Sequence, residues 1–303
     1  MTGANSGIGL ETTRQLAEMG ATVIMGCRSP ARANAALDDV NHSLPKNGRG
    51  KAVVLTESLD LSSVASVISF ANSVKQQYGE LHGIVLNAGM IPGSKYVVSV
   101  DGVENTFASN HLGHFLLVKL LLNHIARVGT PEDPARIVVL SSSLHKIAKS
   151  ADACKPPTEA TYSSFSAYAQ TKLANLLFMN VLIRKIAETP ELAGRITVNA
   201  VHPGNPFTSV TGNMSKALQI LEAMFKPFLY LYRETCTAGA FCSVFATISP
   251  TLVGKNGLYL VDCADAYRSP EAYNMANSEK LWENSETILR EVLAAKNLSL
   301  STN

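Results

Sequence analysis

The sequence predicts an α/β fold in which helices cover both faces of a parallel sheet. Short apolar runs rich in β-branched residues alternate along the chain with longer segments of helical periodicity. The apolar residues within these runs are continuous rather than alternating, which is typical of strands buried on both faces. A glycine-rich turn also stands directly ahead of the first helical segment, as it does in doubly wound sheets that bind nucleotides.

The expected elements follow one another in a regular order. Strands are expected at 21–28, 52–55, 83–86, 137–140, 196–201 and 257–261. Helices are expected at 7–19, 103–125 and 167–186. A polar loop with two adjacent prolines is expected over 149–163. Parallel strands end at the same edge of a sheet, so the residues that follow them should converge there on a ligand.

The opening turn has the composition of a phosphate-binding loop. Its glycines allow a tight turn, a close approach of the backbone to a pyrophosphate and close packing of the helix that follows. That helix would direct its free N–H groups and the positive end of its dipole at a phosphate. The predicted nucleotide contacts in this turn are Gly3, Ser6, Gly7, Ile8 and Gly9.

The end of the strand at 21–28 selects the nucleotide. An acidic residue about 20 positions past the turn would bind the ribose 2′-hydroxyl of NAD, whereas an arginine accommodates the 2′-phosphate of NADP. This strand ends in Cys27-Arg28 without an acid, and Arg32 follows closely. We therefore expect NADP(H), with Arg28 as the residue that binds the 2′-phosphate.

Tyr168 and Lys172 are four residues apart in a helical segment, so their side chains should lie on one face of the helix. An ammonium beside a phenol favours the phenolate and should lower the phenol's pKa toward the range that acid–base catalysis needs. The same spacing also occurs in ordinary solvated surface pairs. The pair becomes informative because it follows a nucleotide-binding turn.

The chain resembles the short-chain dehydrogenase/reductase family, whose motifs occur here in the family's order over nearly the whole length. The matching residues are Thr2 to Gly9, Asp60-Leu61, Asn87-Ala88-Gly89, Asn110, Ser142, Tyr168 with Lys172, and Pro203-Gly204 with Thr208. Three stretches look most like the retinol dehydrogenase and WW-domain oxidoreductase branch, namely 110–115, 169–175 and 202–205.

The resemblance implies one Rossmann-type domain over 1–303 with a catalytic tetrad of Asn110, Ser142, Tyr168 and Lys172. Tyr168 would transfer the alcohol proton, Lys172 would lower its pKa and hold the nicotinamide ribose, and Ser142 would hydrogen-bond the carbonyl oxygen. Asn110 would hold a water between Lys172 and solvent. The other implied cofactor contacts are Asp60, Asn87, Ala88, Gly89, Pro203, Gly204 and Thr208.

Residues 205–232 are expected to form a substrate lid. The segment is rich in Met, Leu and Phe and lies where the resembled family places its lid. Such a lining suits a lipophilic substrate, retinoid-like or steroid-like. A membrane-surface or partner-binding role for the same apolar side chains is the competing interpretation.

One departure from the family concerns the first strand. In that family the glycine turn follows a central strand of a sheet ordered 3-2-1-4-5-6-7, whereas here Met1 directly precedes Thr2-Gly3. We therefore expect a truncated first strand, which would leave two neighbouring strands with unpaired backbone groups. Stability and cofactor affinity should both suffer.

Composition excludes several classes of protein. The net charge of +2 implies neither a nucleic acid nor an acidic membrane surface as partner. The five cysteines lack paired or metal-binding spacing, and His111-x-x-His114 has no accompanying ligand set, so we expect reduced thiols and no metal. Neither a spanning segment nor a signal peptide is evident. We expect an intracellular monomer or homodimer, cytoplasmic or membrane-associated.

Three functions remain open from the sequence. The first is an NADP-dependent oxidoreductase that interconverts a lipophilic alcohol and its aldehyde or ketone, which the complete tetrad favours. The second is a catalytically weak or inactive protein that binds nucleotide or a partner, which the truncated strand favours. The third is a sugar epimerase or dehydratase of the related extended family, whose glycine turn has a different spacing.

Overall fold

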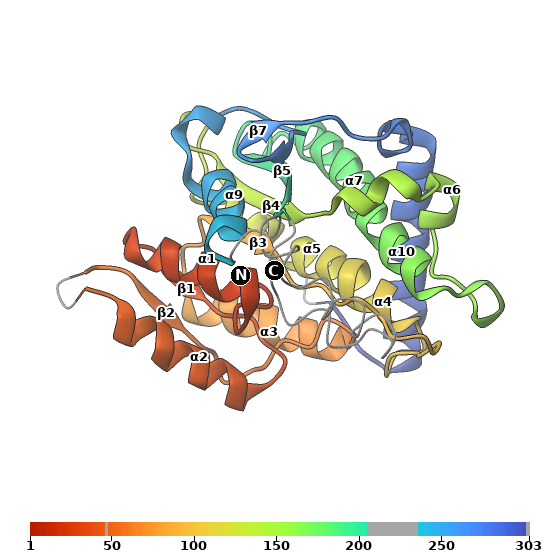
Figure 1. The fold of residues 1–303 in the computed structure, drawn as a ribbon, viewed down its shortest axis with the longest axis horizontal. Helices are drawn as coiled ribbons and strands as arrows, with labels where there is room; N and C mark the ends of the chain where they lie inside the picture. The colour runs from red at the N-terminus through yellow and green to blue at the C-terminus, as the bar shows by residue number, and fades with distance from the viewer. Residues whose placement is uncertain (46–47, 205–235, 301–303) are drawn as a thin grey trace, which may run out of the picture.

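The computed structural model describes residues 1–45, 48–204 and 236–300, and it has the expected α/β architecture (Figure 1). Its strands are β1 (Thr22–Ile24), β2 (Lys51–Val53), β3 (Gly83–Leu86), β4 (Ala135–Leu140), β5 (Ile196–His202), β6 (Tyr259–Val261) and β7 (Ala264–Asp265). Its helices are α1 (Gly7–Glu18), α2 (Pro30–Ser43), α3 (Val64–Gln77), α4 (Asn105–Phe107), α5 (Gly113–Ala126), α6 (Ser150–Ala153), α7 (Ser164–Glu188), α9 (Cys236–Ile248) and α10 (Met275–Ala295).

The strands form two adjacent groups. β1 and β2 pair in parallel, and a separate sheet has the order β3-β4-β5-β6-β7, parallel except for the antiparallel β6–β7 pair. Met1 and Thr2 bridge the two groups. The Thr2 amide donates to the Val85 carbonyl (3.0 Å), while the Met1 carbonyl accepts from the Gly26 amide (2.8 Å). The sheet is thus interrupted where the truncated first strand was expected.

Helices lie on both faces of the sheet. α1, α2 and α9 cover one face, and α3, α5, α7 and α10 cover the other (Figure 1). The larger part of the core lies between the sheet and this second group, where the Phe115 and Trp282 rings meet edge-on with centroids 4.7 Å apart. β4 and β5 are buried along their whole length, which agrees with their mainly apolar sequences.

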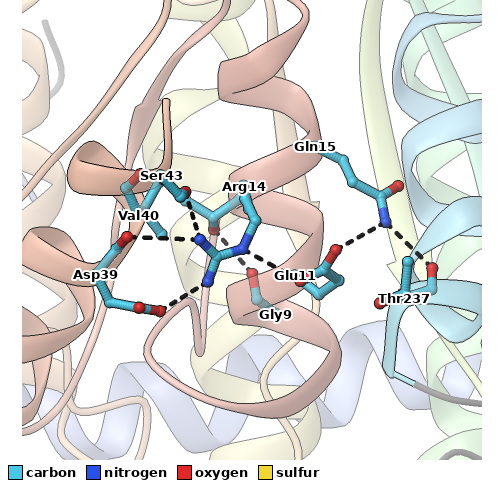
Figure 2. Close-up of polar contacts among 9 residues, drawn as sticks. Gly9, Glu11, Arg14, Gln15, Asp39, Val40, Ser43 and Thr237 are labelled. Carbon is cyan, nitrogen blue, oxygen red and sulfur yellow. Dashed lines mark hydrogen bonds and ion pairs between the residues drawn. The ribbon is translucent and has the colours of Figure 1, made fainter. Parts of the chain in front are cut away.

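Polar contacts of α1 fix the helix that follows the glycine turn (Figure 2). Arg14 donates to Asp39 (2.7 Å) and Ser43 (2.5 Å) of α2 and to Glu11 (3.3 Å) of α1 itself. On the other side, Gln15 donates to the Thr237 carbonyl of α9 (3.1 Å). The helix that follows the glycine turn is therefore held against α2 on one side and α9 on the other.

The expected helix 103–125 has a more complex form. A short α-helical segment, α4, leads into a π-helical turn, η1 (Ala108–Leu112), before α5 begins. The wider turn contains Asn110, and π-helical turns of this kind occur frequently at functional sites. The expected loop 149–163 also contains two short helical segments, α6 and the 3₁₀-helix η3 (Glu159–Thr161). Among the described residues, no helix has the length and apolarity to cross a membrane.

Candidate active site

Seven of the predicted site residues line one cleft at the carboxyl ends of the strands. The cleft has a volume of about 260 Å³. Its walls come from the glycine turn, the end of β1, the segment after β2 and the segment after β3. The predicted residues that line it are Gly3, Ser6, Arg28, Asp60, Ala88, Gly89 and Asn110. Arg28 and Asp60, which follow β1 and β2, thus converge on this cleft, whereas Gly7, Ile8, Gly9 and Asn87 are not among the residues that line it.

The glycine turn depends on its glycines for geometric reasons. Gly3 and Gly7 have φ angles of +65° and +56°, a region that side chains other than glycine rarely adopt. A Cβ on Gly9 would lie 2.2 Å from the Gly3 carbonyl oxygen, so α1 can approach the turn only with glycine there. Ser6 makes no side-chain cap at the start of α1, which leaves the helix N-terminus open to an anion.

Asn87 and Thr2 hold the glycine turn in place through hydrogen bonds. The Asn87 amide donates to the carbonyls of Thr2 (2.8 Å) and Gly3 (3.3 Å). The Thr2 hydroxyl accepts from the Ala88 amide (2.9 Å) and contacts Nε2 of buried His114 (2.8 Å). The side chain of Asn87, predicted as a cofactor contact, thus holds the shape of the glycine turn.

Arg28 and Arg32 provide the positive charge of the cleft. Both are exposed and line its wall together with Ser29, the N-cap of α2. Asp60 lies opposite, where one carboxylate oxygen accepts from the amide (3.0 Å) and hydroxyl (2.7 Å) of Ser62. The end of β1 is therefore basic, and the acid of the cleft lies beyond β2, as the sequence indicated.

Asn110 joins two elements of the site. Its Oδ1 accepts from the Met90 amide (2.8 Å), and its Nδ2 donates to the Met90 carbonyl (3.0 Å) and to the Thr171 hydroxyl (3.1 Å). The residue is fully buried. Three of its four side-chain hydrogen-bonding positions therefore have partners among the described residues, and one lone pair of Oδ1 remains for the water expected there.

Ser142 is the serine that faces Tyr168. The two side chains share a hydrogen bond, and the Ser142 hydroxyl also accepts from the Leu144 amide (3.3 Å). Ser141 is buried and donates to the Lys172 carbonyl (2.8 Å). The backbone stays extended just after β4, so the two serines point to opposite sides, with Ser142 on the side of the tyrosine.

Lys172 is buried in α7 with little compensation for its charge. Its Nζ is 3.4 Å from the Leu140 carbonyl oxygen and 5.4 Å from the centroid of the Tyr168 ring. Gly89 faces it so closely that a Cβ there would lie 3.2 Å from Nζ. Burial lowers the pKa of Lys172 from 10.5 to about 8, because a buried ammonium loses its hydration.

The pKa of Tyr168 shifts in the direction opposite to the sequence expectation. Burial raises it to about 12, and the hydrogen bond from Ser142 lowers it only in part. The Lys172 ammonium lies over the phenol ring rather than against its hydroxyl, and its own charge is disfavoured by burial. The prediction that Lys172 lowers the pKa of the Tyr168 phenol is therefore wrong.

Some predicted residues lie at or beyond the limit of the described chain. Pro203 and Gly204 follow β5 directly, and Gly204 has a φ of +72°. Thr208 and the whole expected lid, 205–232, fall outside the described residues.

The histidines considered as a metal pair both make hydrogen bonds inside the protein, His111 to Ser285 (3.0 Å) and His114 to Thr2.

Sequence reasoning missed several residues that support the site. Thr171 and Asn175 flank Lys172 and contact Asn110 and the Leu140 carbonyl, respectively. His145 lies just beyond Ser142 and accepts a hydrogen bond from Ser269. Thr171 and Asn175 are four residues apart on α7 and so share a face of the helix. This spacing could have predicted that both contact the surroundings of Lys172. Nothing in the local sequence pointed to the contact of His145 with a distant loop.

Comparison with known proteins identifies the family. The sequence profile of the short chain dehydrogenases matches residues 1–219. The WW domain-containing oxidoreductase of Gallus gallus is 36% identical over 303 residues, 98% of this chain and 69% of that protein. Human retinol dehydrogenase 14 is 34% identical over 297 residues, 95% of this chain and 85% of that protein.

A solved structure supports the same assignment. An uncharacterised protein from Mycobacterium paratuberculosis superposes with a TM-score of 0.67 at 29% identity, covering 95% of this chain and 91% of that one. The chain therefore belongs to the short chain dehydrogenases, a family of nicotinamide-dependent oxidoreductases, in the branch of the retinol dehydrogenases and the WW domain-containing oxidoreductases.

Proposed function

We propose that the protein is an NADP(H)-dependent oxidoreductase that interconverts a lipophilic alcohol and its aldehyde or ketone. The observation that carries the proposal is that one residue connects the nucleotide cleft with the helix of the acid–base groups. Asn110 lines the nucleotide cleft and, through Thr171, contacts the helix that holds Tyr168 and Lys172. Acid–base groups and a phosphate-binding turn thus meet at one edge of the sheet.

The residues present fit a dinucleotide. The uncapped N-terminus of α1 offers backbone N–H groups to a pyrophosphate, and the turn admits its close approach because Gly9 has no side chain. Arg28 and Arg32 suit a 2′-phosphate, since arginine forms charge-assisted, often bidentate pairs with phosphate. When bound, the nicotinamide would supply or accept the hydride, while the protein supplies position and electrostatics.

The protein's own groups handle the proton and the substrate oxygen. Tyr168, already hydrogen-bonded to Ser142, donates its phenolic proton to the oxygen of the reduced carbonyl or accepts it from the alcohol. Ser142 stabilises the charge that develops on that oxygen. With a pKa of about 8, Lys172 can exchange a proton near neutrality. Asn110 hydrogen-bonds to the Met90 backbone and to Thr171 of α7, and it thereby fixes the position of α7 next to Lys172.

The preference for NADPH is tested with Arg28→Ala. Loss of a hydrogen bond to a charged group costs about 1.5–3 kcal/mol, so we expect the Kd for NADPH to rise about 10- to 100-fold while that for NADH changes little. Arg290→Ala, an exposed arginine of α10 that is remote from the cleft, is the matched control. Equal affinities of the unmutated protein for NADPH and NADH would contradict the proposal.

The substrate class rests on the branch and on the composition of 205–232. The relatives named retinol dehydrogenase point to a long apolar alcohol, and the apolar residues of 205–232 suit such a substrate. Each buried CH₂ contributes about 0.8 kcal/mol, so kcat/KM should rise with chain length across a series of aldehydes up to retinal.

We expect Tyr168→Phe to abolish turnover. The matched control is Tyr267→Phe, which changes an exposed tyrosine and should leave turnover unchanged. Faster turnover of short polar aldehydes would exclude this class.

A nucleotide-binding protein of weak or no activity is the second candidate. The interruption of the sheet between β1 and β3, directly beneath the glycine turn, favours it. NADPH titration together with an aldehyde turnover assay separates the two candidates. Tight binding without turnover supports the second, whereas turnover that depends on Tyr168 supports the first.

We further propose that residues 1–303 form one domain with a lid at 205–232. Limited proteolysis with and without NADPH tests both points. Cleavage confined to 205–232, and slowed by NADPH, is the expected result. Early cleavage within a strand of the sheet would contradict the single domain.

A further inference from the structure

His145 lies between the segment of Ser142 and a distant loop. It belongs to the 3₁₀-helix η2 (Ser143–Ile147), which begins directly after Ser142, and its side chain is fully buried. Its Nδ1 is 2.7 Å from the Ser142 carbonyl oxygen, and its Nε2 accepts from the Ser269 amide at 3.2 Å. The ring also meets Tyr259 of β6 edge-on, with centroids 5.0 Å apart.

Both polar partners of the ring are backbone atoms, and they determine its tautomer. A carbonyl oxygen only accepts, so Nδ1 must carry the hydrogen that reaches Ser142. An amide only donates, so Nε2 must present its lone pair to Ser269. The only form of histidine that satisfies both contacts is the neutral Nδ1–H tautomer. Protonation would place a hydrogen on Nε2 facing the Ser269 N–H.

These contacts fix the peptide of Ser142 on two sides. Its carbonyl accepts from the ring and also from the backbone amide of His145 (3.1 Å). Its hydroxyl is hydrogen-bonded to Tyr168. Movement of the imidazole would therefore turn the Ser142 peptide and displace the hydroxyl from the tyrosine.

We propose that His145, as the neutral Nδ1–H tautomer, is a positioning residue that holds Ser142 for proton transfer by tying its carbonyl to the Ser269 backbone. The proposal rests on the proposed oxidoreductase function. Through the hydrogen bonds of His145, the segment 262–269, which precedes α10, is connected to Ser142 and so to the reacting groups.

The charged surroundings of His145 maintain the neutral form. Burial lowers its pKa, and the nearby cations Lys146 of η2 and Arg268 of the adjoining loop act in the same direction. The other titratable groups that face it are His202 at the end of β5 and Tyr259 of β6. Burial lowers the pKa of His202 to about 4 and raises that of Tyr259, so neither carries a charge at neutral pH.

Variants of His145 and Ser269 test the positioning role. His145→Phe keeps an aromatic ring against Tyr259 but removes both hydrogen bonds. We expect kcat to fall about 10- to 100-fold, the scale of a small misplacement of reacting groups, while the Kd for NADPH and the KM stay within about two-fold. His145→Asn, whose amide can still donate to the Ser142 carbonyl, should recover most of kcat.

Ser269 offers a matched pair of backbone variants. Its φ of −60° already suits proline, so Ser269→Pro removes the N–H with little strain at that residue. Ser269→Ala removes the hydroxyl but keeps the N–H. We expect kcat of Ser269→Pro to fall at least five-fold below that of Ser269→Ala. Equal kcat values for the two variants would overturn the proposal.

The tautomer can be observed without an activity assay. In protein labelled with [¹⁵N]histidine, His145 should show a protonated Nδ1 and an unprotonated Nε2 at pH 7, and this signal should vanish in His145→Asn. An Nε2–H tautomer or an imidazolium would overturn the proposal. Full activity of His145→Phe in an active enzyme would overturn only this inference, whereas an unmutated protein that binds NADPH but reduces no aldehyde would overturn the proposed function as well.

Discussion

Replacement of Lys172 by methionine should stabilise the protein while it removes the ammonium from the site. The lysine side chain is 4% exposed, and among the described residues its ammonium has one weak hydrogen-bond partner, the Leu140 carbonyl oxygen at 3.4 Å. It takes part in none of the ion pairs of the described residues. Methionine has a similar length, fills irregular apolar space and needs no hydration.

The magnitude follows from the pKa of the lysine. Burial lowers it from 10.5 to about 8 in the folded protein, and each pKa unit corresponds to about 1.4 kcal/mol. The folded state therefore carries a penalty of about 3 kcal/mol wherever the lysine is protonated in both states. That is a large share of a typical unfolding free energy of about 5–15 kcal/mol.

The sign of the pH dependence distinguishes this effect from ordinary repacking. Below about pH 8 the lysine is protonated in both the folded and the unfolded chain, so the penalty is complete. Between about pH 8 and 10.5 the unfolded chain holds more protons at this group than the folded chain. The free energy of unfolding therefore increases as the pH rises through this range. Above that range both forms are neutral and the penalty is gone.

Urea denaturation at pH 7 and pH 10.5 measures the effect. Lys172→Met should exceed the unmutated protein by about 3 kcal/mol at pH 7, and the difference should shrink at the higher pH. Lys255→Met, at an exposed position, controls for removal of a lysine as such. No gain at pH 7, or a gain of equal size at both pH values, would refute the reasoning.

Three further outcomes are expected. Gly9→Ala should lower the free energy of unfolding by about 1–3 kcal/mol and weaken NADPH binding, because its Cβ would lie 2.2 Å from the Gly3 carbonyl oxygen; urea denaturation and titration measure both. Gly89→Ala should leave the melting temperature unchanged but lower kcat about ten-fold, because its Cβ would displace the Lys172 ammonium; unchanged kinetics would contradict this. A stretch of about five or six apolar residues, one strand in length, fused ahead of Met1 should raise the melting temperature and tighten NADPH binding together, since β1 and β3 face each other there across a narrow bridge.

The parts of the fold that depend on local signals could be predicted from the sequence. The strand expected at 83–86 coincides with β3, and the helix expected at 7–19 ends one residue earlier, at Glu18. Residues after the strand ends do converge, since Arg28, Asp60 and Gly89 line one cleft. These successes have the same origin, because hydrophobic runs and glycines act over a few residues.

The features that were missed depend on distant partners. The π-helical turn at Ala108–Leu112 contains Asn110, whose side chain contacts Met90 and Thr171, 20 and 61 positions away. The contact between His145 and Ser269 spans 124 positions. The raised pKa of Tyr168 reflects the desolvation of its phenol in the folded protein, which the spacing of tyrosine and lysine cannot reveal.

The predicted site residues divide into two groups by what their polar atoms already contact. Asn87 and Asn110 direct their side chains at the protein backbone, so they shape the site more than they contact a ligand. Arg28 and Ser6 line the cleft, and their side chains make no hydrogen bond to another residue in the described part of the chain. Substitution of the supporting residues should therefore lower stability and cofactor affinity together, because the turn loses its shape. Substitution of Arg28 should change affinity alone, since an exposed side chain contributes little to folding.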